Sequence, residues 1–204
     1  LELLDQANKI NSLDYNTRQA AFLEFLGNTS PAERDDCVFN LHCHTFFSYN
    51  GYGMSPQGLV ALARSEGWYA LGTVDFDVLD GVDETLSSAD LAAVRAVAGM
   101  ETRTFVPEFA NDEINSPGEP GVCYHVGLGF CCRQVPQKAS RAFAQMRAGA
   151  EQRNRALLDR IMPTLAPLSL DYDQDIKSLT PAGNATERHI LVALDTAARR
   201  LYPD

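Results

Sequence analysis

Apolar and amphipathic segments alternate through the middle of the chain, and this alternation constrains the fold more than any other feature. Four apolar runs have the composition of strands: residues 37–41, 69–74, 96–106 and 122–130. Segments with helical spacing, at 55–67 and 88–96, separate the first three runs. The first begins with Ser55-Pro56 and stops at Gly67, as helices commonly do. Strands that alternate with helices predict an α/β fold built on a parallel sheet or barrel.

The flanking regions read as mainly helical. Residues 1–27 have helical spacing interrupted near 11–16, which predicts one or two amphipathic helices, and a polar loop follows. We therefore divide the chain into an N-terminal helical extension and linker, residues 1–36, and an α/β domain, residues 37–204. Within that domain the last third predicts a long helix, a weak strand and a final helix, at 136–163, 168–170 and 186–201.

Composition removes several classes of protein. A chain of 204 residues with 45% hydrophobic residues can bury a proper core as one large domain or two small ones. The formal charge of -10 disfavours nucleic acid as a partner, because such a surface repels polyanions. No apolar run reaches the roughly 20 residues that span a bilayer. We therefore expect no membrane association.

The cysteine content bears on the compartment. Five cysteines cannot all pair, and their spacing shows no disulfide framework. Free thiols predict a reducing, cytoplasmic location. Cys43 and Cys123 are expected to be small core residues.

Two histidines stand at the end of the first predicted strand. In Asn40-Leu41-His42-Cys43-His44-Thr45, side chains two apart point to the same face, so His42 and His44 project together. Paired imidazoles at a strand end are natural metal ligands. For an isolated pair, two buried histidines bonded to backbone would be the better explanation.

Later strand ends carry further ligand types. Asp75 and Asp77 follow the second strand, Glu101 lies in the third, and His125 lies in the fourth. Three of the four histidines in the chain thus fall where a barrel would gather them at one mouth. Chance placement is the poorer explanation of this pattern.

An ordered set of motifs over residues 37–130 resembles the PHP (polymerase and histidinol phosphatase) superfamily of metal-dependent phosphoesterases. The matching elements are His42-Cys43-His44-Thr45, Ser48, Ser55-Pro56 to Gly67, Val74-Asp75-Phe76-Asp77, Gly99-Met100-Glu101 and Tyr124-His125-Val126. A weaker resemblance covers 183–193, with Arg188-His189-Ile190 at a helix start.

The resemblance implies a distorted TIM-like (β/α)7 barrel that binds divalent metal ions at its strand ends. His42, His44 and Glu101 would hold one ion, and Glu101 would bridge to a second ion bound by His125. Zn, Mn or Fe suits such mixed imidazole and carboxylate ligands. Two ions held close together clamp a phosphate and acidify a bound water.

Three departures from the family pattern limit what is implied. Phe76 occupies the position of a histidine that binds a third metal, and a benzyl ring has no lone pair to donate. Tyr49 or Asn50 replaces another ligand of that site. The family's late Asp-x-His pair has no counterpart after His125. Either the last barrel strands lie beyond Asp204, or the chain carries a half-site.

Asp75 and Arg188 have two readings each, and Asp77 and His189 have one. Asp75 orients a ligating imidazole or bonds backbone amides, and Asp77 caps the following loop under the second reading. Arg188 and His189 reach a substrate phosphate, or Arg188 is a solvated residue at a helix start. Asp75, Arg188 and His189 are the predicted catalytic residues.

The sequence thus predicts a cytoplasmic, metal-dependent phosphoesterase of PHP type with a small phosphorylated substrate, either a phosphomonoester or a nucleotide-like phosphate. Two divalent ions are expected, and Phe76 puts a third in doubt. Two other readings stay open: a degenerate PHP module that binds or scaffolds, and an amidohydrolase-like enzyme acting on a carbonyl substrate. The sequence predicts no oligomeric state.

Overall fold

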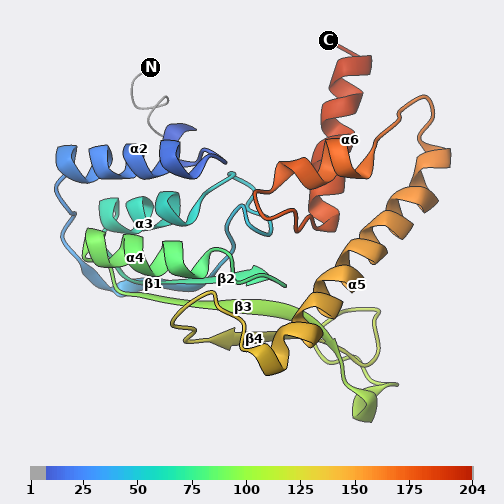
Figure 1. Cartoon of the computed structure of the whole chain (residues 1–204), viewed down its shortest axis with the longest axis horizontal. Helices are drawn as coiled ribbons and strands as arrows, with labels where there is room; N and C mark the ends of the chain where they lie inside the picture. The colour runs from blue at the N-terminus through green and yellow to red at the C-terminus, as the bar shows by residue number, and fades with distance from the viewer. Residues whose placement is uncertain (1–7, 204) are drawn as a thin grey trace.

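A curled sheet of four strands organises the protein, whose computed structural model describes residues 8–203. The strands lie in chain order: β1 (Asp35–Cys43), β2 (Trp68–Phe76), β3 (Ala96–Phe105) and β4 (Val122–Leu128). The first three are parallel, as the alternation of strands and helices predicts. The α/β class is confirmed, and the sheet has the curvature of half a barrel (Figure 1).

The fourth strand departs from the expected parallel arrangement, because β4 runs antiparallel to β3. Parallel neighbours need a crossover connection, usually a helix, to return the chain to the same end of the sheet. The segment between these strands contains only the short 3₁₀ helix η1 (Pro107–Phe109). It closes as a hairpin connection, with the Val106 N–H donating to the Gly121 carbonyl.

Three helices lie on one side of the sheet: α2 (Tyr15–Asn28), α3 (Pro56–Ser65) and α4 (Val82–Ala92) (Figure 1). Helix α3 begins where the Ser-Pro signal predicts, since the Ser55 hydroxyl accepts a hydrogen bond from the Gly58 N–H. Helix α4 covers earlier residues than the predicted 88–96. It ends at Ala93, which adopts a left-handed conformation and allows the chain to turn into β3.

The main core fills the space between the sheet and these helices. Leu71 of β2, Val60 of α3 and Phe22 of α2 are fully buried in one cluster. A buried ion pair joins Arg18 of α2 to Glu84 of α4. Part of the predicted N-terminal extension therefore packs into the same core as the sheet, and the division at residue 36 stays a prediction.

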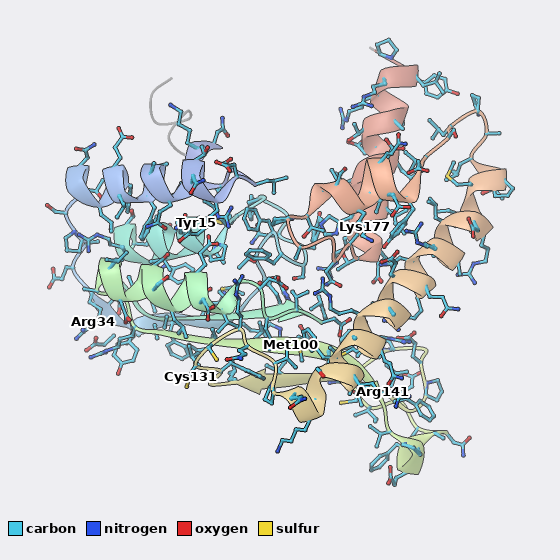
Figure 2. The ribbon with its side chains drawn as sticks, in the orientation of Figure 1. Tyr15, Arg34, Met100, Cys131, Arg141 and Lys177 are labelled. Atoms are coloured by element: carbon cyan, nitrogen blue, oxygen red, sulfur yellow. The ribbon has the colours of Figure 1, made fainter. Side chains whose placement is uncertain are left out.

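Helices α5 (Gln137–Ile161) and α6 (Glu187–Leu201) form a second packed group with the loop between them. In Figure 2 the label Met100 locates β3 of the sheet, and the label Lys177 locates the loop between α5 and α6. The loop contains η2 (Met162–Thr164), the π-helical turn η3 (Tyr172–Ile176) and η4 (Lys177–Leu179).

The weak strand predicted at 168–170 is wrong. These residues join no sheet in the described chain, and the Leu168 N–H is already used in a turn to the Leu165 carbonyl. The acidic segment at 171–175, in which Asp171 caps η3, is a local turn.

The other face of the sheet is open along β1. All of β1 except Cys43 is exposed, and the Phe39 side chain keeps 60% of its surface accessible. Edge strands β1 and β4 have no outer neighbour within residues 8–203. Over the same residues, no helix combines the length and apolar character required to cross a membrane.

Candidate metal centre

Two imidazoles and one carboxylate converge at the open face of the sheet. His42 and His44 come from the end of β1 and Glu101 from β3, with β2 between them. Each imidazole Nε2 lies 3.1 Å from Glu101 Oε2. Their potential ligand atoms all fall within 4.8 Å of one another, and this is the one such group of three or more found in the part of the chain that the structure describes.

The spacing of these atoms fits a common cation. Ligand bonds to zinc are about 2.0–2.1 Å for imidazole nitrogen and similar for carboxylate oxygen, so adjacent ligand atoms around one ion lie about 2.8–3.4 Å apart. Both 3.1 Å separations fall in this range. The contact between His42 Nε2 and Glu101 Oε2 has hydrogen-bond geometry, whereas the contact between His44 Nε2 and the same oxygen does not. The donor set therefore fits a divalent metal ion.

The three side chains differ strongly in exposure. The Glu101 side chain is 9% exposed, that of His44 19% and that of His42 55%. Glu101 and His44 thus form a protected floor, and His42 closes one side at the solvent boundary. Three protein ligands with an open side are typical of catalytic rather than structural metal sites.

Burial lowers the pKa of His44 below its usual value, and the nearby charges of His42 and Arg188 act in the same direction. The carboxylates of Asp75 and Glu101 oppose this shift. A neutral imidazole is the form that binds a metal ion. The environment of His44 therefore favours the ligating state.

Asp75 organises the loop that follows His44. Its carboxylate accepts hydrogen bonds from the Thr45 N–H, the Thr45 hydroxyl and the Ser48 hydroxyl, at 2.6–2.7 Å. Burial raises the pKa of Asp75, while these hydrogen bonds oppose the shift. Asp75 therefore bonds a backbone amide and two hydroxyls. It does not orient the His44 imidazole, because His44 Nδ1 has no hydrogen-bond partner among the described residues.

Asp77 lies just beyond the end of β2 in a left-handed conformation, with φ of 56°. Its carboxylate accepts a hydrogen bond from the Thr102 hydroxyl, and its N–H donates to the Glu101 carbonyl. Burial raises the pKa of Asp77. These contacts tie the end of β2 to the segment of β3 that carries Glu101.

His125 does not join the other three predicted ligands. It pairs with Thr102, whereas Glu101 pairs with Val126. Directly opposed residues share a face and neighbours alternate, so His125 and Glu101 occupy opposite faces of the sheet. His125 is also exposed and stands outside the group of converging donors.

The start of α6 approaches the site through Tyr49. Arg188 lies over the Tyr49 ring at 5.7 Å and is near enough for its charge to influence His44. His189 packs edge-on against the same ring. Its Nδ1 accepts a hydrogen bond from the Thr186 N–H, which makes it part of the cap of α6. Burial lowers the pKa of His189 to about 4.

Sequence reasoning missed the role of two residues of the site. Tyr49, considered only as the replacement of a ligand, links α6 to the loop after β1, and Asn184 donates from its side-chain amide to the Phe76 carbonyl at 2.7 Å. Asn184 is 108 positions from Phe76 along the chain, so no local pattern indicates the contact. Asn50, which had been considered only as a replaced ligand, donates to the His44 carbonyl.

Comparison with solved structures identifies proteins of similar fold. One similar structure is a presumed metal-dependent phosphoesterase from Bifidobacterium adolescentis, with a TM-score of 0.62 and 21% identity over 85% of this chain and 53% of that one. Another is an amidohydrolase from Chromobacterium violaceum with bound sulfate and no metal, with a TM-score of 0.55 and 16% identity over 80% of this chain and 50% of that one. No family model and no curated protein matches the sequence.

At these identities the similarity concerns the fold. This chain spans about half the length of each similar structure. The capacity for divalent metal binding rests on this chain's own converging imidazoles and carboxylate.

Proposed function

We propose that this protein is a metal-dependent hydrolase of PHP type that acts on phosphate esters. The observation that carries the proposal is the convergence of His42, His44 and Glu101 at an open strand end. A divalent ion held by these residues would polarise a phosphoryl oxygen and lower the pKa of a bound water. The TIM-like (β/α)7 barrel implied by the family resemblance belongs to the same proposal.

The proposed centre holds two divalent ions, with Zn, Mn or Fe as candidates. His42, His44 and Glu101 would hold the first ion, and Glu101 would contribute to the second. The family resemblance implies His125 for the second ion, but His125 lies on the opposite face of the sheet from Glu101 and is not part of the proposed centre. Phe76 offers no lone pair for a third ion.

Arg188 is the residue that we propose for the substrate phosphate. It is exposed, it lies near His44, and a guanidinium can hold a phosphate through two parallel hydrogen bonds. Tyr49 stacks beneath it and limits its orientations. We assign supporting roles to Asp75, which holds the Thr45–Ser48 loop, and to His189, which caps α6 and packs on Tyr49.

The proposed substrate is a small phosphomonoester or a nucleotide-like phosphate. Exposed Cys37, Cys131 and Cys132 are unpaired, which agrees with the proposed cytoplasmic location.

A carbonyl substrate is the second candidate, because one of the two similar structures is an amidohydrolase. The same ligand geometry polarises a carbonyl oxygen. Assays that compare aryl phosphates with amides at equal metal loading separate the two hydrolase activities.

The non-catalytic alternative is a degenerate module that binds or scaffolds. Phe76 and the missing Asp-x-His pair motivate it. It predicts metal content well below one ion per chain and no turnover with any added divalent ion.

The test combines metal binding and hydrolysis. Chain stripped with EDTA is titrated with Zn²⁺ or Mn²⁺ by calorimetry and then assayed on a generic aryl phosphate. We expect at least one tight site, and we expect Glu101→Gln to lose both metal binding and turnover. Glu108→Gln, at an exposed carboxylate in η1, is the matched control and should behave as the unmodified chain does. Unchanged metal content in Glu101→Gln would end the proposal.

A further inference from the structure

The ring of His44 lacks the support that metal-bound histidines usually receive. Such histidines almost always donate their second ring N–H to a carboxylate, carbonyl or water, which fixes the plane of the ring. In His44 the second nitrogen is Nδ1, which is buried and has no hydrogen-bond partner among residues 8–203. Asp75, the carboxylate whose charge acts most strongly on His44, is already bonded to Thr45 and Ser48. Another contact must hold the ring.

That contact is an aromatic stack. The rings of His44 and Phe76 have centroids 4.6 Å apart and planes only 12° from parallel. Phe76 also packs against Tyr124, with ring centroids 5.9 Å apart and ring planes at 67°. In the sheet register Phe76 pairs with Glu101, so Phe76 and the carboxylate share the open face. The Phe76 ring thus lies beside the two inner ligands without donating to a metal ion.

The backbone of Phe76 is held from two directions. Its carbonyl accepts a hydrogen bond from the side-chain amide of Asn184, which belongs to the loop before α6. The next residue, Asp77, is fixed to β3 through Thr102 and through the Glu101 carbonyl. Because its backbone is held in this way, the Phe76 ring can restrict the orientation of the His44 ring that stacks on it.

We propose that Phe76 is the positioning residue of the metal centre: its stacked ring fixes the plane of His44, so that Nε2 points at the ion, in place of a hydrogen bond donated by the Nδ1–H. Phe76 touches neither the ion nor the substrate. The inference rests on the proposed function only in taking His44 as a ligand. It predicts that metal affinity depends on a flat ring at position 76.

The first experiment measures metal affinity of the full chain by calorimetric titration with Zn²⁺ after EDTA stripping. Phe76→Leu keeps an apolar side chain but removes the ring, and we expect it to weaken zinc binding by about 10–100-fold, the usual cost of removing the support of a ligand. Phe76→Tyr keeps the ring and should stay within about threefold of the original affinity. Phe109→Leu, an exposed aromatic in η1, is the control for ring removal elsewhere.

A second measurement needs no metal and begins with the unmodified chain. In proton NMR spectra of the stripped chain, the stacked ring should shift the His44 ring resonances upfield relative to those of exposed His125. Loss of that shift in Phe76→Leu, with unfolding temperature close to that of Phe76→Tyr, supports positioning over a general packing role. If Phe76→Leu fails to fold, Phe76→Met replaces it, and the unmodified spectrum alone still tests the stack.

The outcomes separate this inference from the proposed function. Tight zinc binding that is equal in Phe76→Leu and the unmodified chain overturns the positioning role and leaves the metal site intact. An absent upfield shift at His44 overturns it as well. Failure of the unmodified chain to bind zinc, with the His44 shift present, overturns the proposed function and leaves the stack in place.

Discussion

The two faces of the sheet differ in the contacts that their ionisable side chains make. On the face covered by α2, α3 and α4, buried Asp75 has both carboxylate oxygens satisfied by Thr45 and Ser48. On the open face, His42, His44 and Glu101 converge on a common position, and the buried Nδ1 of His44 has no hydrogen-bond partner among residues 8–203. Buried polar groups in proteins are normally paired, and those left unpaired need an explanation.

This difference separates structural residues from functional ones. The covered face resembles the core of any α/β protein, because its polar groups hold loops and its apolar groups pack. The open face holds a cluster whose members gain most from a ligand. Substitutions on the covered face should therefore change stability, and those on the open face should change metal binding.

The largest stability effect is expected at Asp75. Asp75→Ala leaves the Thr45 N–H and two hydroxyls without an acceptor in a buried site, at about 1–3 kcal/mol for each unsatisfied group. We expect the free energy of unfolding to fall by about 4 kcal/mol. Glu101→Gln on the open face should change it by less than about 1 kcal/mol. Urea denaturation in EDTA measures both, and equal losses would remove the distinction between the faces.

Substitution of apolar residues should also reduce the free energy of unfolding more on the covered face than on the open face, by a somewhat smaller amount than at Asp75. Leu71 is fully buried against the helices, so Leu71→Ala should cost about 3 kcal/mol through lost burial and the cavity left behind. Phe39 on β1 is 60% exposed, and Phe39→Ala should cost less than about 1 kcal/mol. A large loss at Phe39 would mean that the open face is packed in solution.

A pH effect extends the comparison to α6. The pKa of His189 is about 4 in the folded protein and about 6.5 when unfolded. Between these values the unfolded chain binds more protons, so stability falls as the pH drops below about 6.5, by about 2 kcal/mol at pH 5. Above pH 6.5 both states are neutral and the effect is absent. His189→Gln, which can still cap the helix, should unfold with a weaker pH dependence in this window.

The reactivity of two cysteine thiols on β1 compares the covered and exposed parts of the sheet without a substitution. Burial raises the pKa of Cys43 to about 11, whereas Cys37 on the same strand is exposed. Because the thiolate is the reactive form, Cys43 should resist a maleimide at pH 8 while Cys37 is labelled. Mass spectrometry of the digested protein locates the label. Equal labelling of the two would show that β1 opens readily.

Much of the covered face follows from local sequence signals. Ser55-Pro56 placed the start of α3, and the apolar runs placed β2 and β3, because caps and buried strands leave short-range patterns. The direction of β4 could not be read in this way, because an apolar run looks the same in either orientation. The early start of α4 at Val82 was missed because Gly81, the residue before it, has no capping side chain.

The metal cluster could also be predicted in part from local sequence signals. His42 and His44 are two residues apart on one strand, and Glu101 follows at the matching end of a parallel strand, so both alternation and topology place them together. His125 fails this rule because its strand is antiparallel and its register turns it to the other face. The contacts of Phe76 with His44 and of Asn184 with Phe76 depend on tertiary packing, for which the chain has no local pattern.

The most direct test of the central claim is a crystal of the protein soaked with Zn²⁺ or Mn²⁺ and measured at the absorption edge of that metal. The account predicts an anomalous peak about 2.0–2.3 Å from His42 Nε2, His44 Nε2 and a Glu101 carboxylate oxygen. A strong peak elsewhere, or none at this position at millimolar metal with the open face free of lattice contacts, would contradict it.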